Sequence, residues 1–239
     1  MTSRIRILGI ALVIGGLLFV GAGGFAFVKV QEGTASLQAF STQQNVKLAY
    51  DAKGQLGGAN PEEAAGIMAL LTEDWKYPVV QGDLNPNDPM VNTATEYMYQ
   101  MATINYHVLH STQTVVLTAD AKAADGSVIP AGTYQFPVDG RYYSEFDRTN
   151  PIEGAARGLA WTGTALGLVG ELGVGTATAS ALQLALAMAA LFGAIGLLTL
   201  MTGFGLVWVS RAQPVLVDSK STATVATTPG GMPARVGTR

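Results

Sequence analysis

The stretch ILGIALVIGGLLFVGAGGFAFV, residues 7–28, contains no charged side chain in 22 positions. As a helix rising 1.5 Å per residue it is about 33 Å long, enough to cross a hydrocarbon core about 30 Å thick. A cleaved signal peptide has a shorter apolar run that ends in small residues. Here the run continues past the glycines at 21–24 through FAFV. A retained transmembrane helix is therefore the favoured interpretation, and a cleaved signal is the alternative.

A second uncharged segment extends from Leu172 to Ser210. Its 39 residues would form a helix about 58 Å long, too long for one upright span. The first part, LGVGTATAS, is rich in glycine and threonine. We therefore expect a juxtamembrane helix at 159–180 and a second transmembrane helix at 181–209, with Glu171 at the headgroup boundary.

Aromatic and small residues of this region add two expectations. Trp208 near the inner boundary and Trp161 on the outer approach are expected at headgroup level. Gly163 and Gly167 have the GxxxG spacing, which indicates either a plain glycine-rich helix or a seam between two helices.

The distribution of charge predicts the orientation of the chain. Residues 1–6 carry two arginines and no acid, and residues 211–239 carry four basic residues and one acid. Residues 31–171 carry seven basic and sixteen acidic residues, a net charge of −9. Because basic flanks stay in the cytoplasm, we expect a plasma-membrane protein with both termini cytoplasmic and the central domain extracytoplasmic. The acidic domain argues against a nucleic-acid partner.

Composition narrows the chemistry further. There are no cysteines, which excludes disulfides, thiolate zinc sites, iron–sulfur clusters and a cysteine nucleophile. Residues 1–6 form a short cytoplasmic N-terminus. The tail at 210–239 is rich in Ser, Thr, Pro and Gly and is predicted to be a disordered cytoplasmic segment.

Residues 31–158 are expected to form one extracytoplasmic α+β domain. NPEEAAGIMALL begins a helix, with Asn60 as N-cap and Pro61 in the first turn. A second helix is predicted from Pro89 to about Thr112. Predicted strands are NVKLAY (45–50), YPVV (77–80) and TVVLTA (114–119), with a hairpin that turns at Asp125–Gly126.

The segment EYMYQMATINYHVLH, residues 96–110, holds both histidines of the chain. On a helix, an apolar stripe at four-, three- and four-residue spacing predicts a core face: Tyr97, Met101, Ile104 and Val108. His107 and His110 are the candidate metal ligands, because side chains at i and i+3 can share a cation.

A metal site at this pair needs a third ligand. Glu96 lies about 21 Å from His110 along the helix, so the ligand must come from another element, such as Asp120, Asp139 or Glu145. The competing interpretation is two boundary histidines bonded to backbone or tyrosine. The sequence contains no GxSxG, P-loop or HExxH pattern, and no catalytic or cofactor-binding residue is predicted.

Two stretches carry a resemblance: DPMVNTATEYMYQMATINYHVLH at 88–110, and GRYYSEFDRTNP at 140–151 before the second span. With these, the chain resembles a family of uncharacterised actinobacterial two-span membrane proteins. The resemblance implies a basic N-terminus, a span, an outer domain and a second span. Some relatives are labelled as the small subunit of an aromatic-ring-opening dioxygenase. That chemistry needs two histidines and a carboxylate on iron, and we do not carry it over.

Three classes of function follow from these patterns. The first is an envelope membrane protein whose outer domain is a non-catalytic interaction or accessory subunit, with the lipid bilayer and another membrane or envelope protein as partners. The second is a membrane protein that senses a ligand through its outer domain. The third is a metal-dependent enzyme that uses His107 and His110.

Overall fold

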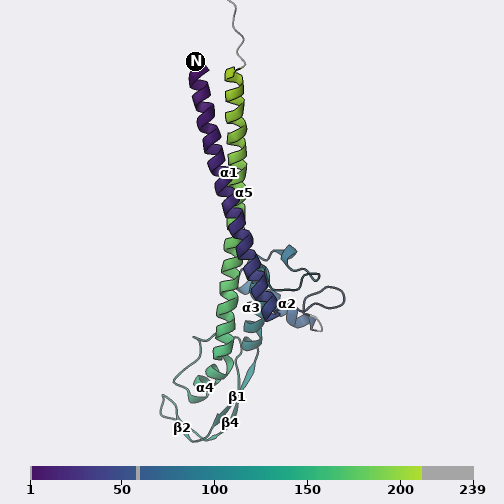
Figure 1. Cartoon of the computed structure of the whole chain (residues 1–239). Helices are drawn as coiled ribbons and strands as arrows, with labels where there is room; N and C mark the ends of the chain where they lie inside the picture. Colours follow the sequence, from purple (N-terminus) through teal and green to yellow (C-terminus); the bar gives the residue numbers. More distant parts are fainter. Residues whose placement is uncertain (1, 58–59, 212–239) are drawn as a thin grey trace, which may run out of the picture.

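A computed structural model describes residues 2–57 and 60–211. Two long helices, α1 (Thr2–Gln44) and α5 (Gly163–Arg211), lie side by side with a small α+β region at one end (Figure 1). Both helices are long and apolar enough to cross a membrane. The prediction of two such helices flanking an α+β region is confirmed. The predicted disordered tail lies outside the described residues, apart from Ser210 and Arg211, which belong to α5.

Helix α1 is longer than the predicted span at 7–28. It continues through residues 31–44, which were assigned to the outer domain, and so has 43 residues and a length of about 64 Å. No proline interrupts it, and α5 packs along it. Asn45 ends it by adopting a left-handed conformation, φ +51°, as residues that follow a helix often do.

Helix α5 is also continuous, so residues 163–180 and 181–209 are one element of 49 residues. The expected juxtamembrane helix does not begin at 159. A separate helix, α4 (Pro151–Ala160), ends there and the chain turns at Trp161. The Trp161 side chain is 5% exposed and its Nε1 donates to the Arg141 carbonyl at 3.2 Å. Trp161 is therefore a core residue, and its expected place at headgroup level is wrong.

A seam of small residues joins α1 and α5. The buried positions Gly9, Gly16 and Gly23 of α1 are seven residues apart. They face three small residues of α5 at the same spacing, Gly203, Gly196 and Ala189. A seven-residue repeat keeps one face of each helix on its partner, and small residues let the two backbones approach closely. We call these six residues the glycine seam.

Three further helical elements lie between the long helices in the chain. They are α2 (Pro61–Ala69), the π-helical turn η1 (Leu70–Asp74) that continues it, and α3 (Ala94–Leu109). A short 3-10 turn, η2 (Gln81–Asp83), is a fourth and precedes α3. The predicted cap of α2 is confirmed, because the Asn60 side chain accepts from the Glu63 amide. Thr93 caps α3 in a reciprocal pair with Glu96, so α3 begins five residues after the predicted start at Pro89.

The strands form one nested hairpin. β1 (Thr112–Leu117) pairs antiparallel with β4 (Gly132–Pro137), and inside them β2 (Ala121–Lys122) pairs with β3 (Val128–Ile129). The predicted turn is confirmed, with Gly126 at φ +85°. The predicted strands at 45–50 and 77–80 are wrong. The first makes only isolated bridges, including Lys47 to Met90, and neither segment has a neighbouring strand to extend a ladder.

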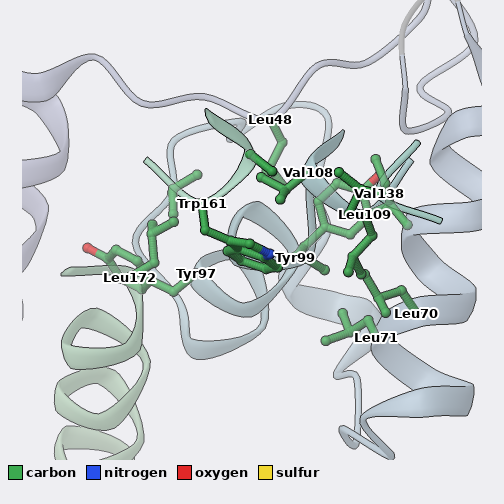
Figure 2. Close-up of a cluster of buried hydrophobic side chains, with 14 of the residues drawn as sticks. Leu48, Leu70, Leu71, Tyr97, Tyr99, Val108, Leu109, Val138, Trp161 and Leu172 are labelled. Carbon is green, nitrogen blue, oxygen red and sulfur yellow. The ribbon is translucent and has the colours of Figure 1, made fainter. Parts of the chain in front are cut away.

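The core of the α+β region includes residues of α5. Buried side chains of α3, the hairpin and the connecting segments pack together with Leu172, as Figure 2 shows for Tyr97, Tyr99 and Trp161. Leu172 and Ala179 of α5 are both buried in this cluster. The α+β region and the helix pair therefore share one core, and residues 31–158 are not a separately packed unit.

Candidate functional site

A groove lies where α1, α3 and α5 meet, and it consists of two adjoining cavities. The first has a volume of about 220 Å³ and the second of about 360 Å³. Phe40, Tyr97 and Glu171 line both cavities, so the two cavities adjoin, and we call them together the groove. The remaining lining is mostly apolar, including Ile104, Leu168 and Val174.

The groove follows the two long helices toward their apolar ends. The first cavity is lined by residues of α1 up to Gln44 and of α5 from Leu168. The second is lined by α1 as far back as Leu37 and by α5 as far forward as Thr178. Because α1 and α5 are antiparallel, falling numbers on α1 and rising numbers on α5 describe the same direction. That direction leads to the uncharged segments of both helices.

Tyr97 fixes the inner wall of the groove. Its hydroxyl hydrogen-bonds to the Ser41 hydroxyl at 2.8 Å, which joins α3 to α1, and both side chains are buried. Its ring lies on Gly175, where a Cβ would be 2.6 Å from the ring carbons. Only glycine leaves room for the ring at this point of α5. Small residues thus bring α5 against α3 as they bring it against α1.

The polar groups of the groove are few. Gln44, Gln100 and Glu171 line it beside the Ser41–Tyr97 pair. Glu171 is the only charged residue among the lining residues of either cavity. An apolar channel with a few polar groups at one end is typical of a site for an amphiphilic or largely apolar molecule.

A second group of polar residues is buried at the start of α3. The Glu96 side chain is 2% exposed, and its Oε2 accepts from the backbone amides of Asn92 and Thr93 at 3.0 and 2.9 Å. Burial raises the pKa of the Glu96 carboxyl, and these hydrogen bonds offset only part of the rise. Burial also raises the pKa of Tyr99 to about 12. The hydrogen bonds from Asn92 and Thr93 show that Glu96 caps the start of α3.

The two histidines have separate partners. His107 Nε2 lies 3.0 Å from Glu63 Oε1, and the imidazole is 57% exposed. His110 follows the last residue of α3. Its Nδ1 lies 2.8 Å from the Tyr106 carbonyl oxygen. Its ring stacks on the Tyr106 ring, with the two centroids 4.0 Å apart.

The structure brings no third ligand to the predicted metal pair. Among residues 2–57 and 60–211, no three His, Cys, Asp or Glu side chains lie together as a metal site requires. Two of the three acids suggested as third ligands have other partners: Asp120 Oδ1 accepts from the Ala131 amide, and Glu145 Oε2 accepts from the Tyr142 amide. His110 has the partners that the competing interpretation named, backbone and tyrosine, whereas His107 pairs with the Glu63 carboxylate.

The predicted apolar stripe of α3 is only part of its buried surface. Tyr97 and Val108 are buried as expected, but so are three residues away from that stripe, Glu96, Tyr99 and Asn105. α3 is covered on one side by α5 and on another by α2 and η1. A single-helix pattern does not indicate this second contact.

The glycine seam and the groove were not predicted. The seam has a visible sequence signal, because its three glycines in α1 are seven residues apart. The groove has none, since its lining comes from three distant segments of the chain, 37–46, 91–104 and 168–178.

Comparison with known proteins gives no relative for this arrangement. No family model, curated protein or solved structure matches the chain.

Proposed function

We propose that the chain is an integral protein of the plasma membrane, with both termini cytoplasmic and an outer α+β domain that acts as a non-catalytic interaction or accessory subunit. The observation that carries this proposal is the pair α1 and α5. Two apolar helices joined by a glycine seam continue without a break into the core of the outer region.

The register of the two helices supports the membrane placement. Gly9 faces Gly203 and Gly23 faces Ala189, so the uncharged parts of both helices coincide. Figure 1 shows the start of α1 beside the end of α5, so Arg4 and Arg6 lie at the same end as Arg211. Large apolar side chains point outward from this part of both helices; Leu18 is 70% exposed and Trp208 is 71% exposed. Such a surface suits lipid and not water.

The same register supports a boundary near Lys29. Lys29 Nζ and Glu32 Oε2 form an ion pair at 2.6 Å just past the uncharged segment of α1. Gly33 lies against Leu182 of α5. Residues of α5 before about 182 are thus level with the polar part of α1, which favours a span that begins near the predicted residue 181.

The non-catalytic role is supported by the way the outer region uses its polar groups. Glu96 caps α3, Asn105 donates to the Met101 carbonyl, and Glu153 accepts from Arg141 and from the Asp147 amide. These groups stabilise the fold. What the two long helices add is a rigid attachment of the outer surface to the bilayer, a property suited to assembly with another membrane or envelope protein.

The membrane placement predicts the result of a reporter experiment. A reporter that is active only outside the cytoplasm should be silent when fused after residue 239, and active when inserted in the exposed Asp125–Gly126 turn. The silent fusion should reach the membrane fraction in the same amount. Activity at residue 239 would contradict the two-span topology.

The accessory role predicts the native mass of the full-length protein, extracted from its own membranes in mild detergent. We expect a species heavier than the 24.8 kDa chain by a different polypeptide. A bare chain, or a multiple of its mass, would contradict the accessory role.

A second candidate is a ligand-sensing membrane protein, and the groove between α1, α3 and α5 is the observation that favours it. In the same measurement, a chain heavier by only a small molecule would support this candidate.

A further inference from the structure

We infer that the groove binds one acyl chain of a phospholipid from the outer leaflet, with the ammonium-bearing head group of that lipid beside Glu171. The inference rests on the proposed membrane placement, and it names the ligand class of the groove.

The first argument is continuity with the bilayer. The second cavity reaches Leu37 of α1 and Thr178 of α5. Lys29 and Glu32, which bound the uncharged part of α1, lie one to two turns farther along, and Leu182 lies one turn past Thr178. Leu37 and Val174 form an apolar wall on this side of the second cavity, and Thr178 is the polar residue at its end, so the groove opens toward the bilayer along a mostly apolar surface.

The second argument is length. The lining of the groove on α5 extends from Leu168 to Thr178, ten residues apart, which is about 15 Å along a helix. A leaflet occupies half of a hydrocarbon core about 30 Å thick, so one extended acyl chain has about this length. With the head group beside Glu171, the chain extends along the groove to Thr178, about 10 Å farther along α5, and its remaining length reaches the start of the span near residue 181.

The third argument is charge. Glu171 is the only charged lining residue, and the amides of Gln44 and Gln100 are the nearest polar groups in the first cavity. Residues 31–171 carry seven basic and sixteen acidic residues, a net charge of −9. A carboxylate in an acidic domain attracts an ammonium group and repels an anionic phosphate without a compensating cation. Because the carboxylate accepts hydrogen bonds that a quaternary ammonium cannot donate, the head group is zwitterionic with a primary amine.

The test uses the full-length protein in detergent, stripped of lipid and then mixed with equal amounts of phosphatidylethanolamine and phosphatidylglycerol that have identical acyl chains. Native mass spectrometry reads the bound lipid. We expect one phosphatidylethanolamine per chain, preferred over phosphatidylglycerol by about threefold, as for one partly exposed charge pair. Glu171→Gln should remove that preference while the chain still binds lipid.

A matched pair of variants tests the groove itself. Gly170 lines the second cavity, and a Cβ there meets nothing within 4 Å, so Gly170→Trp is tolerated by the helix and fills the groove. Gly173 also has open space but lines neither cavity. We expect Gly170→Trp to lower lipid occupancy about tenfold or more and Gly173→Trp to leave it unchanged, with equal helix content by circular dichroism.

Three outcomes overturn the inference. These are equal lipid retention by the two tryptophan variants, no lipid on the wild-type chain, and a phosphatidylglycerol preference that Glu171→Gln does not alter. A polypeptide on the wild-type chain that is lost in Gly170→Trp would assign the groove to a protein partner instead. Failure of the membrane placement is separate, because the wild-type protein would then be absent from the membrane fraction.

Discussion

Gly16→Leu is expected to lower the free energy of unfolding by about 3 kcal/mol, the upper part of the range for overpacked contacts. A Cβ at Gly16 would lie 2.8 Å from the Leu200 backbone nitrogen and 2.9 Å from the Gly196 carbonyl oxygen. Backbone atoms cannot rotate away as a side chain can. The only relief is to move α1 from α5, and this movement also opens the contacts above and below in the glycine seam.

Gly15→Leu is the matched control, since it makes the same change one residue earlier. A Cβ at Gly15 meets nothing within 4 Å, and it faces outward from the pair. We expect a change within about 0.5 kcal/mol. Both variants lose the flexibility of glycine in a helix, so the difference between them isolates the seam. Denaturant unfolding in detergent micelles, monitored by circular dichroism, measures this difference in the free energy of unfolding. Equal stabilities would show that α1 and α5 are not held together by this seam.

The seam shows what the sequence could predict of the fold. Each apolar segment is visible on its own, because its length and lack of charge are local properties. Which face meets the other helix depends on a partner more than 150 positions away in the chain. The glycines at 21–24 were considered as a signal-peptide end, and Gly163 and Gly167 as a seam. In the structure Gly23 is in the seam, but a Cβ at Gly21, Gly24, Gly163 or Gly167 would meet open space.

The candidate site shows the same limit. Caps and turns were predictable at Asn60 and Gly126, since their chemistry lies within a few residues. The groove was not, because it exists only when α3 lies against the end of α1 and the start of α5. From the sequence, Glu171 was expected at a headgroup boundary; in the structure it lines the groove, which the sequence did not indicate.

The second large effect is expected at the start of α3. Glu96→Ala should lower the free energy of unfolding by about 2–3 kcal/mol, because it leaves two backbone amides in a partly buried turn without an acceptor. Glu96 Oε2 accepts from the amides of Asn92 and Thr93 and from the Thr93 hydroxyl at 2.9 Å. Glu96→Gln keeps one acceptor oxygen and should cost less. Asp125, whose carboxylate accepts only in the exposed hairpin turn, is the control: Asp125→Ala should cost less than either change.

The pH dependence of Glu96→Gln separates the cap from the titration of the carboxyl. Burial raises the folded pKa of Glu96 above its ordinary value of 4.5. Between the two pKa values the folded chain keeps a proton that the unfolded chain has lost. The contribution of Glu96 to stability is therefore fully present below about pH 4.5 and declines as pH rises through the folded pKa.

Glutamine does not titrate, so the wild-type advantage over Glu96→Gln should shrink between about pH 4 and pH 8. The pKa values of Asp125 and Asp147 are lowered by hydrogen bonds to Ser127 and Thr149, and their contribution to stability has the opposite trend. Wild type and Glu96→Gln both contain Asp125 and Asp147, so the contributions of these two residues cancel in the stability difference between the two proteins. Denaturant unfolding of the two proteins across this range measures it. A difference that grows with pH would mean that the hydrogen bonds from Asn92 and Thr93 outweigh burial, and that Glu96 is held as a stabilised carboxylate.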